Sequence, residues 1–323
     1  MLEYASRSAN QTSGDLPFSG HAGRIRAIEY SPDNRFLATA GEDATVRLWN
    51  PDTGKLIRFG DVLHGPLLGH VDVISSTCFS WDGQLVLDGS HAKTLCVWDS
   101  STGDLRLRPF KGHSGSVTCI EYSPDNRFLA TGGDDGTIQL WNLRTGEQTQ
   151  LMTPNYAVRT LSICRFSRHM VAGSLPDGGF QIWDTATGAT IQGPLRGPID
   201  MTFSICFSSD ASWAIDSAES RTICVWDTSS GALVTGPLRH DRLQGGIRAV
   251  ACSPLKDRIA CLSDKDEVVV WDAKTNEVVL SSASLFSTLY ACDHQLIFNF
   301  TLSSGKIPFR RHDLACFTTR TML

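Results

Sequence analysis

The chain has 323 residues, which is long enough for one large domain or two ordinary ones. Its 41% hydrophobic and 20% charged residues are typical of a globular protein and argue against disorder. The net charge of −5 is spread without a block of like charges, which argues against a nucleic-acid-binding arm and a polybasic membrane anchor. No apolar run is long enough to span a membrane, and the first residues lack a secretory signal. We therefore expect a soluble protein of the cytoplasm or, as a second option, the nucleus.

One pattern of short strands and turns starts near the N-terminus. Ile25–Tyr30 alternates apolar and polar residues, and Ser31–Asn34 has the composition of a turn. Phe36–Ala40 and Thr45–Trp49 predict two more strands joined by a tight turn, and a shorter fourth strand follows Asp52–Gly54. No segment keeps a helical period over about eleven residues. The sequence therefore predicts an all-β protein.

This unit recurs along the chain. Ile28–Asn50 returns nearly unchanged as Ile120–Asn142. A tryptophan ends the third strand of each copy, with spacings of 42 to 49 residues, at Trp49, Trp98, Trp141, Trp183, Trp226 and Trp271. Small sheets repeated in this way bury their faces only against their neighbours, and closing the array into a ring protects the sheet edges.

The copies resemble the WD40 repeat, with Gly-His near the start, Asp in the turn before the third strand, and Trp-Asp or Trp-Asn at the end. The resemblance extends from about Ser19 to Ala273 and implies a β-propeller. In that family His, Ser or Thr, Asp and Trp form a structural hydrogen-bonded tetrad. The resemblance places such tetrads on His21, Thr39, Asp43 and Trp49, and on His113, Thr131, Asp135 and Trp141.

The other copies depart from this tetrad. The second keeps His70 and Trp98 but has Asp88 and Ala92 at the remaining places. The later copies keep the tryptophan and lose most of the other residues. We therefore expect the fourth to sixth copies to be less rigid, or to be held by packing alone.

The segment after Trp271 predicts a seventh, degenerate copy. Leu285–Cys292, Gln295–Thr301 and Lys306–Phe309 have the composition of weak strands, and Asp15–His21 matches the approach to the third copy. We therefore predict a flexible tail over residues 1–14 and a seven-bladed propeller over residues 15–323. The propeller would consist of six clear repeats and a divergent last blade over 283–323. The N-terminal strand would close this last blade. The alternative is a truncated or aberrant C-terminus.

Cysteine and histidine placement gives no sign of metal or cofactor chemistry. Ten cysteines fall singly, mostly within apolar runs where a free thiol acts as a small buried hydrophobe. No phosphate-binding glycine loop and no histidine pair with metal-ligand spacing occur in the sequence. The His, Thr and Asp sets contain the residue types of a catalytic triad, but they recur at identical offsets, whereas catalysis needs one converging pocket. We expect no cofactor, no metal and no enzymatic activity.

In the WD40 family, partners commonly dock on the loops before the first strand and between the second and third strands. These loops contain arginines, acidic residues, one histidine and two large apolar side chains: Arg24, Arg26, Arg248, Glu42, Asp134, Glu219, Asp264, His91, Met201 and Phe203. An acidic rim with local arginines fits a basic or mixed peptide. The alternative is that these are merely solvated loop side chains, and exposed Met201 and Phe203 would argue against it.

Together these features favour a non-catalytic protein–protein interaction scaffold. We predict a monomeric ring within a larger complex, with other proteins as partners and no binding to nucleic acid or membranes. The alternative is a substrate-recognition subunit of a ubiquitin ligase. Against that alternative, the Trp-Asp-x-Arg adaptor motif is absent and no F-box-like helical segment precedes the repeats.

Overall fold

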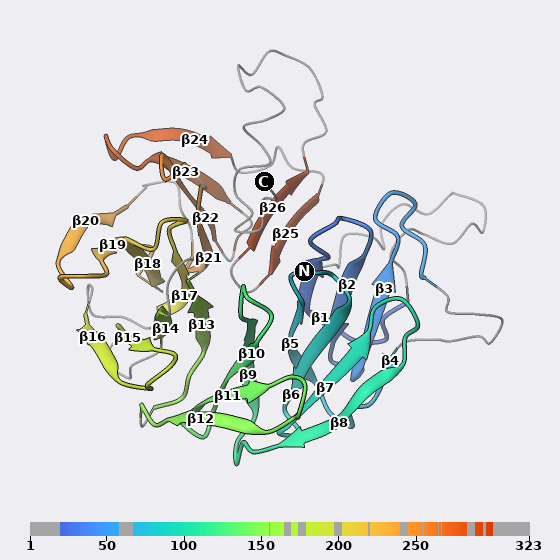
Figure 1. Cartoon of the computed structure of the whole chain (residues 1–323). Helices are drawn as coiled ribbons and strands as arrows, with labels where there is room; N and C mark the ends of the chain where they lie inside the picture. Colours follow the sequence, from blue (N-terminus) through green and yellow to red (C-terminus); the bar gives the residue numbers. More distant parts are fainter. Residues whose placement is uncertain are drawn as a thin grey trace, which may run out of the picture. The chain divides into compact units, whose positions relative to one another are not determined.

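The computed structural model shown in Figure 1 forms two compact units. Unit 1 comprises Met1–Asp135 with Leu140–Gln148, and unit 2 comprises Gly136–Gln139 with Thr149–Leu323. The structure describes residues 20–57, 67–154, 156–164, 169–173, 179–196, 202–218, 220–239, 245–253, 255–263, 265, 267–282, 288–292 and 295–299. Within these ranges only the backbone is described at 107–111, 169–173, 282, 288–292 and 295–299.

Antiparallel sheets of four strands are the repeating element of unit 1. The first sheet contains β1 (Ile25–Tyr30), β2 (Leu37–Gly41), β3 (Thr45–Trp49) and β4 (Leu67–Leu68). The second contains β5 (Ile74–Phe79), β6 (Leu85–Ser90), β7 (Thr94–Asp99) and β8 (Leu105–Lys111). The third contains β9 (Val117–Tyr122), β10 (Phe128–Gly133), β11 (Ile138–Asn142) and β12 (Gln148–Met152), and the residues of its last two strands are divided between the two units.

Unit 2 continues the pattern. The fourth sheet contains β13 (Thr160–Ile163), β14 (His169–Gly173), β15 (Phe180–Asp184) and β16 (Thr190–Leu195). The fifth contains β17 (Thr202–Phe207), β18 (Trp213–Ala218), β19 (Ile223–Asp227) and β20 (Leu233–Leu238). The sixth contains β21 (Ile247–Cys252), β22 (Arg258–Ser263), β23 (Val268–Asp272) and β24 (Val278–Ser282), and β25 (Thr288–Cys292) pairs with β26 (Gln295–Asn299).

All regular elements in the described ranges are strands, so the expected all-β class is confirmed, and no helix there could span a membrane. The described residues contain six four-stranded sheets and one two-stranded sheet. β25 and β26 lie within the segments expected to form weak strands. The tail over 1–14, the N-terminal closing strand and the strand expected over Lys306–Phe309 all lie outside the described residues.

The turn between the first two strands is built by a serine and an aspartate. The Ser31 hydroxyl donates to Asp33 Oδ1 at 2.6 Å and accepts the Phe36 N–H at 2.9 Å. Asn34 adopts a left-handed φ of 58°, which asparagine tolerates better than most residues. The third sheet repeats the arrangement with Ser123 and Asp125. The repeated Ser-Pro-Asp-Asn motif is therefore explained by this turn.

The residue after each repeat tryptophan has a structural reason to be Asp or Asn. The side chain of Asn50 accepts the N–H groups of Asp52 and Thr53 at 3.1 and 3.0 Å. Five further residues accept two backbone N–H groups in the same way: Asp99, Asn142, Asp184, Asp227 and Asp272. This Asx turn leads the chain from the third strand to the fourth.

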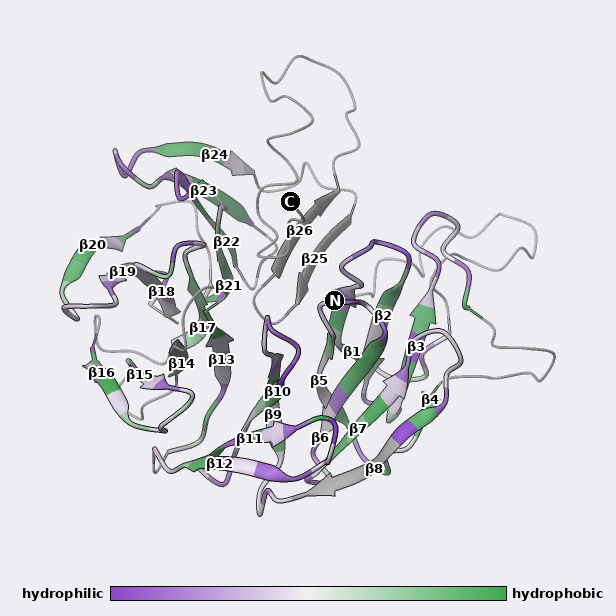
Figure 2. Ribbon diagram, in the orientation of Figure 1, coloured by the Kyte–Doolittle hydropathy of each residue, from purple (hydrophilic) through white to green (hydrophobic). Residues whose placement is uncertain are grey.

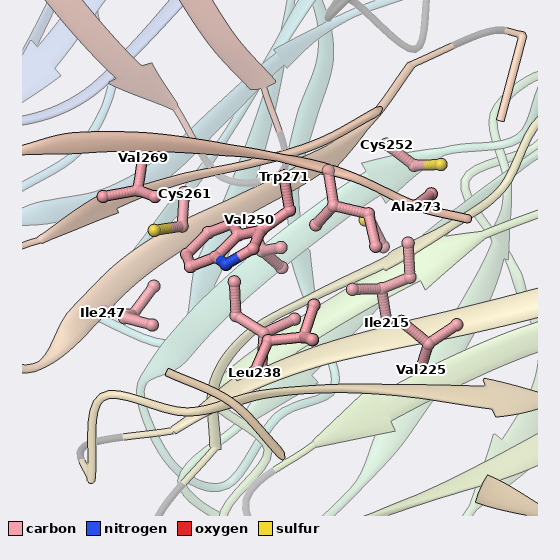
Figure 3. Packing of buried hydrophobic residues seen from close by; sticks show 13 residues of the cluster. Ile215, Val225, Leu238, Ile247, Val250, Cys252, Cys261, Val269, Trp271 and Ala273 are labelled. Carbon is pink, nitrogen blue, oxygen red and sulfur yellow. The ribbon is translucent and has the colours of Figure 1, made fainter. Parts of the chain in front are cut away.

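Neighbouring sheets pack through apolar faces. Figure 3 shows one such cluster in unit 2, where Trp271, Val250 and Cys261 of the sixth sheet lie against Ile215 and Val225 of the fifth. In unit 1, Trp98 and Phe79 of the second sheet join Val46 of the first. Burying apolar surface between sheets in this way supplies most of the driving force for folding.

Serine hydroxyls add polar contacts between adjacent sheets. Ser76 Oγ in β5 accepts the N–H of Ile120 in β9 at 3.2 Å. Ser204 Oγ in β17 accepts the N–H of Val250 in β21 at the same distance. The first strand of one sheet thus satisfies a backbone donor of the next sheet, once in each unit.

Apolar side chains also remain exposed on two fourth strands of unit 2. β20 exposes Leu233 and Val234, and β24 exposes Val278 and Val279. Figure 2 shows the hydrophobic colour on both strands.

Candidate functional site

The first sheet joins four side chains in a hydrogen-bonded chain. Trp49 Nε1 lies 2.7 Å from Thr39 Oγ1, Thr39 Oγ1 lies 2.7 Å from His21 Nε2, and His21 Nδ1 lies 2.9 Å from Asp43 Oδ2. Burial lowers the pKa of His21, although the Asp43 carboxylate opposes this shift. A neutral His21 with its proton on Nδ1 therefore donates to Asp43 and accepts the hydroxyl proton of Thr39. Trp49 donates to the same hydroxyl oxygen.

Asp43 also holds the loop before the first strand. Burial alone would raise the pKa of Asp43, but the N–H of Ala22 and the side chains of His21 and Thr45 donate to the carboxylate and hold its pKa at about 2. The carboxylate therefore stays ionised at neutral pH and fixes the loop that follows His21.

The third sheet repeats this geometry. Trp141 Nε1 lies 2.9 Å from Thr131 Oγ1, which lies 2.7 Å from His113 Nε2. His113 Nδ1 lies 3.0 Å from Asp135 Oδ2, and Asp135 accepts the N–H of Ser114 at 2.7 Å. The structure thus brings together each of the two tetrads expected from the sequence. Their histidines are almost fully enclosed, at 3% and 1% side-chain exposure.

The second sheet builds the network around a carboxyl group instead. Trp98 Nε1 donates to Asp88 Oδ1 at 2.5 Å, and His70 Nε2 lies 2.5 Å from Asp88 Oδ2. His70 Nδ1 lies 2.9 Å from Thr94 Oγ1. The acid therefore faces Nε2 of the histidine, whereas it faces Nδ1 in the first and third sheets. Burial raises the pKa of Asp88 more than His70 and Trp98 lower it.

The fifth sheet has the same aspartate without a histidine. Trp226 Nε1 donates to Asp216 Oδ1 at 2.6 Å. The expectation that the later copies are held by packing alone is therefore wrong for the fifth sheet. Asp88 and Asp216 both lie ten residues before the tryptophan, where Thr39 and Thr131 lie in the other copies. This shared spacing from the tryptophan is the sequence signal that Asp88 and Asp216 accept the indole hydrogen bond. A search for Ser or Thr at this position misses the two aspartates.

A group of possible metal ligands lies in the second sheet. One ligand atom each of His70, Asp88 and Cys96 lies within 4.8 Å of the others. His70 Nε2 and Asp88 Oδ2 lie 2.5 Å apart, as in a close ion pair, whereas two ligands of one zinc ion lie about 3.3 Å apart. Burial and the nearby Asp88 carboxyl also raise the pKa of the Cys96 thiol, which disfavours the thiolate. These three residues therefore do not fit a metal ion.

Backbone hydrogen bonds join the two loops that contain the candidate residues Arg24, Glu42, His91 and Asp134, whereas Arg26, Phe203 and Arg248 lie on first strands. The N–H of Glu42 donates to the carbonyl of Arg24, that of His91 to Val73, and that of Asp134 to Ser116, each at 2.9 Å. The same bond in three sheets holds the turn after the second strand against the loop before the first. We call the surface formed by these two loops the loop face.

The loop face of unit 1 exposes Arg24, His91 and Asp134, and Arg26 is exposed on the adjoining strand β1. Arg26 Nη2 donates to Glu42 Oε1 at 2.5 Å, and this bond lowers the pKa of Glu42. Sequence reasoning missed Val71, which follows His70 and is 91% exposed. In the first and third copies the residue after the histidine is Ala22 or Ser114. A large apolar residue at this position in the second copy is the sequence signal that identifies Val71.

In unit 2, Phe203 is 41% exposed and Arg248 is exposed. Met201, Glu219 and Asp264 lie outside the described residues.

A model of the WD40 family, described as WD domain, G-beta repeat, matches residues 14–50, 62–99, 105–142 and 189–227. The matched segments contain both threonine-centred tetrads, the second-sheet network and the tryptophan of the fifth sheet. These matches and the repeated four-stranded sheets support a WD40 β-propeller.

The chain is similar to the guanine nucleotide-binding protein subunit beta of Arabidopsis thaliana, with 30% identity over 58% of this chain and 52% of that protein. It is 27% identical to autophagy-related protein 16 of the same plant, over 84% of this chain and 52% of the relative. It is 24% identical to the U5 small nuclear ribonucleoprotein 40 kDa protein of Dictyostelium discoideum, over 51% of this chain and 44% of the relative. The chain thus spans about half the length of the curated relatives it matches.

Proposed function

We propose that this protein is a non-catalytic scaffold that binds other proteins through its loop face. The observation that carries the proposal is the use of polar side chains to hold that face. Asp43 and Asp135 accept N–H groups of the loops that follow His21 and His113. A loop ordered before binding loses less entropy when a partner docks, so a fixed loop face favours selective contacts.

The chemistry of the loop face in unit 1 fits a peptide segment with both apolar and charged residues. Val71 is exposed beside the charged loops, and large exposed apolar groups often mark contact sites. Arg24, Asp134 and the Arg26–Glu42 pair supply both signs of charge. The relatives named as a G protein subunit and a ribonucleoprotein component support a role in assemblies.

The experiment is affinity purification with mass spectrometry on wild type and matched variants. Val71→Asp is expected to remove specific partners, because it places a charge in the centre of the proposed contact. Leu255→Asp is the control, because Leu255 is 77% exposed in the turn between β21 and β22, which is not one of the loops that form the loop face. Identical partner sets for wild type and Val71→Asp would contradict the proposed site.

We further propose that the sheets complete a seven-bladed propeller spanning residues 15–323, which is a monomer within a larger cytoplasmic or nuclear assembly. The six four-stranded sheets and the β25–β26 pair support this count. An experimental structure of the whole chain and light scattering test the blade number and the monomer. The ubiquitin-ligase alternative stays a prediction, because no observation favours it.

A further inference from the structure

Asp216 is a carboxyl group inside the fifth sheet. Its side chain projects from the middle strand β18, and the residue is 4% exposed. Its backbone partners across the sheet are Ile205 in β17 and Cys224 in β19. The indole N–H of Trp226 donates to Oδ1 at 2.6 Å. Asp216 is therefore a buried acid whose charged form needs more than one neutral donor to replace water.

Asp88 in the second sheet occupies the position that matches Asp216, and it has a histidine neighbour. Asp88 has the same tryptophan bond and also contacts His70 Nε2 at 2.5 Å. Counting from the tryptophan, the place of His70 is taken by Pro198 in the fifth sheet, where Gly-Pro replaces Gly-His. A proline side chain has no polar donor, whatever its position, so it cannot supply the contact that His70 makes.

The titratable groups on the strands packed against Asp216 do little to stabilise its ionised form. On β19, burial and the Asp216 carboxyl raise the pKa of the Cys224 thiol to about 12, so it stays neutral. Cys206 on β17 and Cys252 on β21 are buried thiols, and Arg248 on β21 is exposed. β14 and β15 contribute His169 and Asp184 by sequence, and β20 contains no titratable residue. No charge on the described residues offsets the burial of Asp216.

Burial therefore raises the pKa of Asp216 to about 6, because the bond from Trp226 and a backbone hydrogen bond lower it only in part. A group that binds its proton more tightly in the folded state stabilises that state at low pH. The contribution is complete below the ordinary aspartate pKa of about 4 and is lost as pH rises through about 6.

We propose that Asp216 is a pH-dependent switch in the fifth sheet, closed when its carboxyl group carries a proton and locally loosened when the group ionises. The effect is expected at the end of β18, because Asp216 lies two residues before that end. Ala218, at that end, pairs with Thr202 in β17, next to the exposed Phe203. Ionisation is expected to admit water at this end of β18 and β19, and so to weaken the support of Phe203.

The direct test is a carbon-13 NMR titration of the Asp216 carboxyl group in the full-length protein, assigned by its loss in Asp216→Asn. The expected midpoint is near pH 6. A midpoint below about pH 4.5 would overturn the proposal, even if the variant were too unstable for further work.

Amide hydrogen exchange then locates the change. After correction for intrinsic rates, the opening of β18 and β19 in wild type is expected to increase about tenfold between pH 5 and 7.5. The increase should disappear in Asp216→Asn, which keeps an acceptor for Trp226, and should persist in Thr131→Ser of the third sheet. Equal pH dependence in wild type and Asp216→Asn would contradict the switch.

Discussion

The first and third sheets satisfy their tryptophans with a threonine hydroxyl, whereas the second and fifth sheets use a carboxyl group. A buried hydroxyl stays neutral and passes one hydrogen bond on to a histidine. A buried carboxyl group must be either paired, as Asp88 is with His70, or protonated. The position ten residues before the tryptophan is therefore occupied in three ways in these four sheets: by a hydroxyl group, by a carboxyl group paired with a histidine, or by a carboxyl group without a histidine. The three arrangements respond differently to substitution and to pH.

The largest effect is expected from removing a tryptophan. Trp141→Ala deletes a buried indole and removes the donor to the Thr131 hydroxyl, so the free energy of unfolding should fall by about 3–5 kcal/mol. Urea unfolding followed by circular dichroism measures this loss. A loss below about 1 kcal/mol would show that the tryptophan network is not a major support of the third sheet.

The two carboxyl-centred sheets should respond in opposite directions to one substitution. Asp88→Asn keeps an acceptor for Trp98 but removes the carboxyl group that pairs with His70, so stability should fall by about 3 kcal/mol. Asp216→Asn keeps the single acceptor that Trp226 needs and removes the buried charge, so stability at pH 7.5 should rise by about 1–2 kcal/mol. Parallel urea curves at pH 5 and 7.5 measure both, and two losses of similar size would refute the distinction.

The hydroxyl-centred sheets are tested by removing one oxygen. Thr131→Val leaves Trp141 Nε1 and His113 Nε2 without their shared partner and should cost about 1–3 kcal/mol. Thr131→Ser restores the hydroxyl and should recover most of the loss. Equal stability of the valine and serine variants would mean that packing, rather than the hydrogen bonds, holds the third sheet.

The smallest effect is expected between sheets. Ser204→Ala removes the acceptor of the Val250 N–H and should lower the free energy of unfolding by about 1 kcal/mol. Ser76→Ala should have a similar effect through Ile120. Thermal unfolding compares the two units, and no change in either variant would assign the contact between sheets to apolar packing alone.

Much of this architecture is predictable from the sequence because it depends on local patterns. The recurring tryptophans and the Ser-Pro-Asp-Asn turns predict the strand order, since their chemistry acts within a few residues. The roles of Asp88 and Asp216 were missed because a family pattern that expects Ser or Thr hides an acid performing the same task. The exposure of Val71 and the bond from Ile120 to Ser76 depend on which loops and strands meet across sheets, and sequence periodicity does not reveal this.

The central claim is that the polar networks stabilise the sheets while the loop face binds partners. The most direct test is to measure unfolding and partner capture together for Asp135→Ala, at a temperature where the variant stays folded. The expected result is a clear fall in the free energy of unfolding, with the same partners as the wild type captured more weakly, because Asp135 no longer orders the loop that follows His113. Loss of specific partners with the stability unchanged would instead show that Asp135 contacts partners itself, and would contradict the claim.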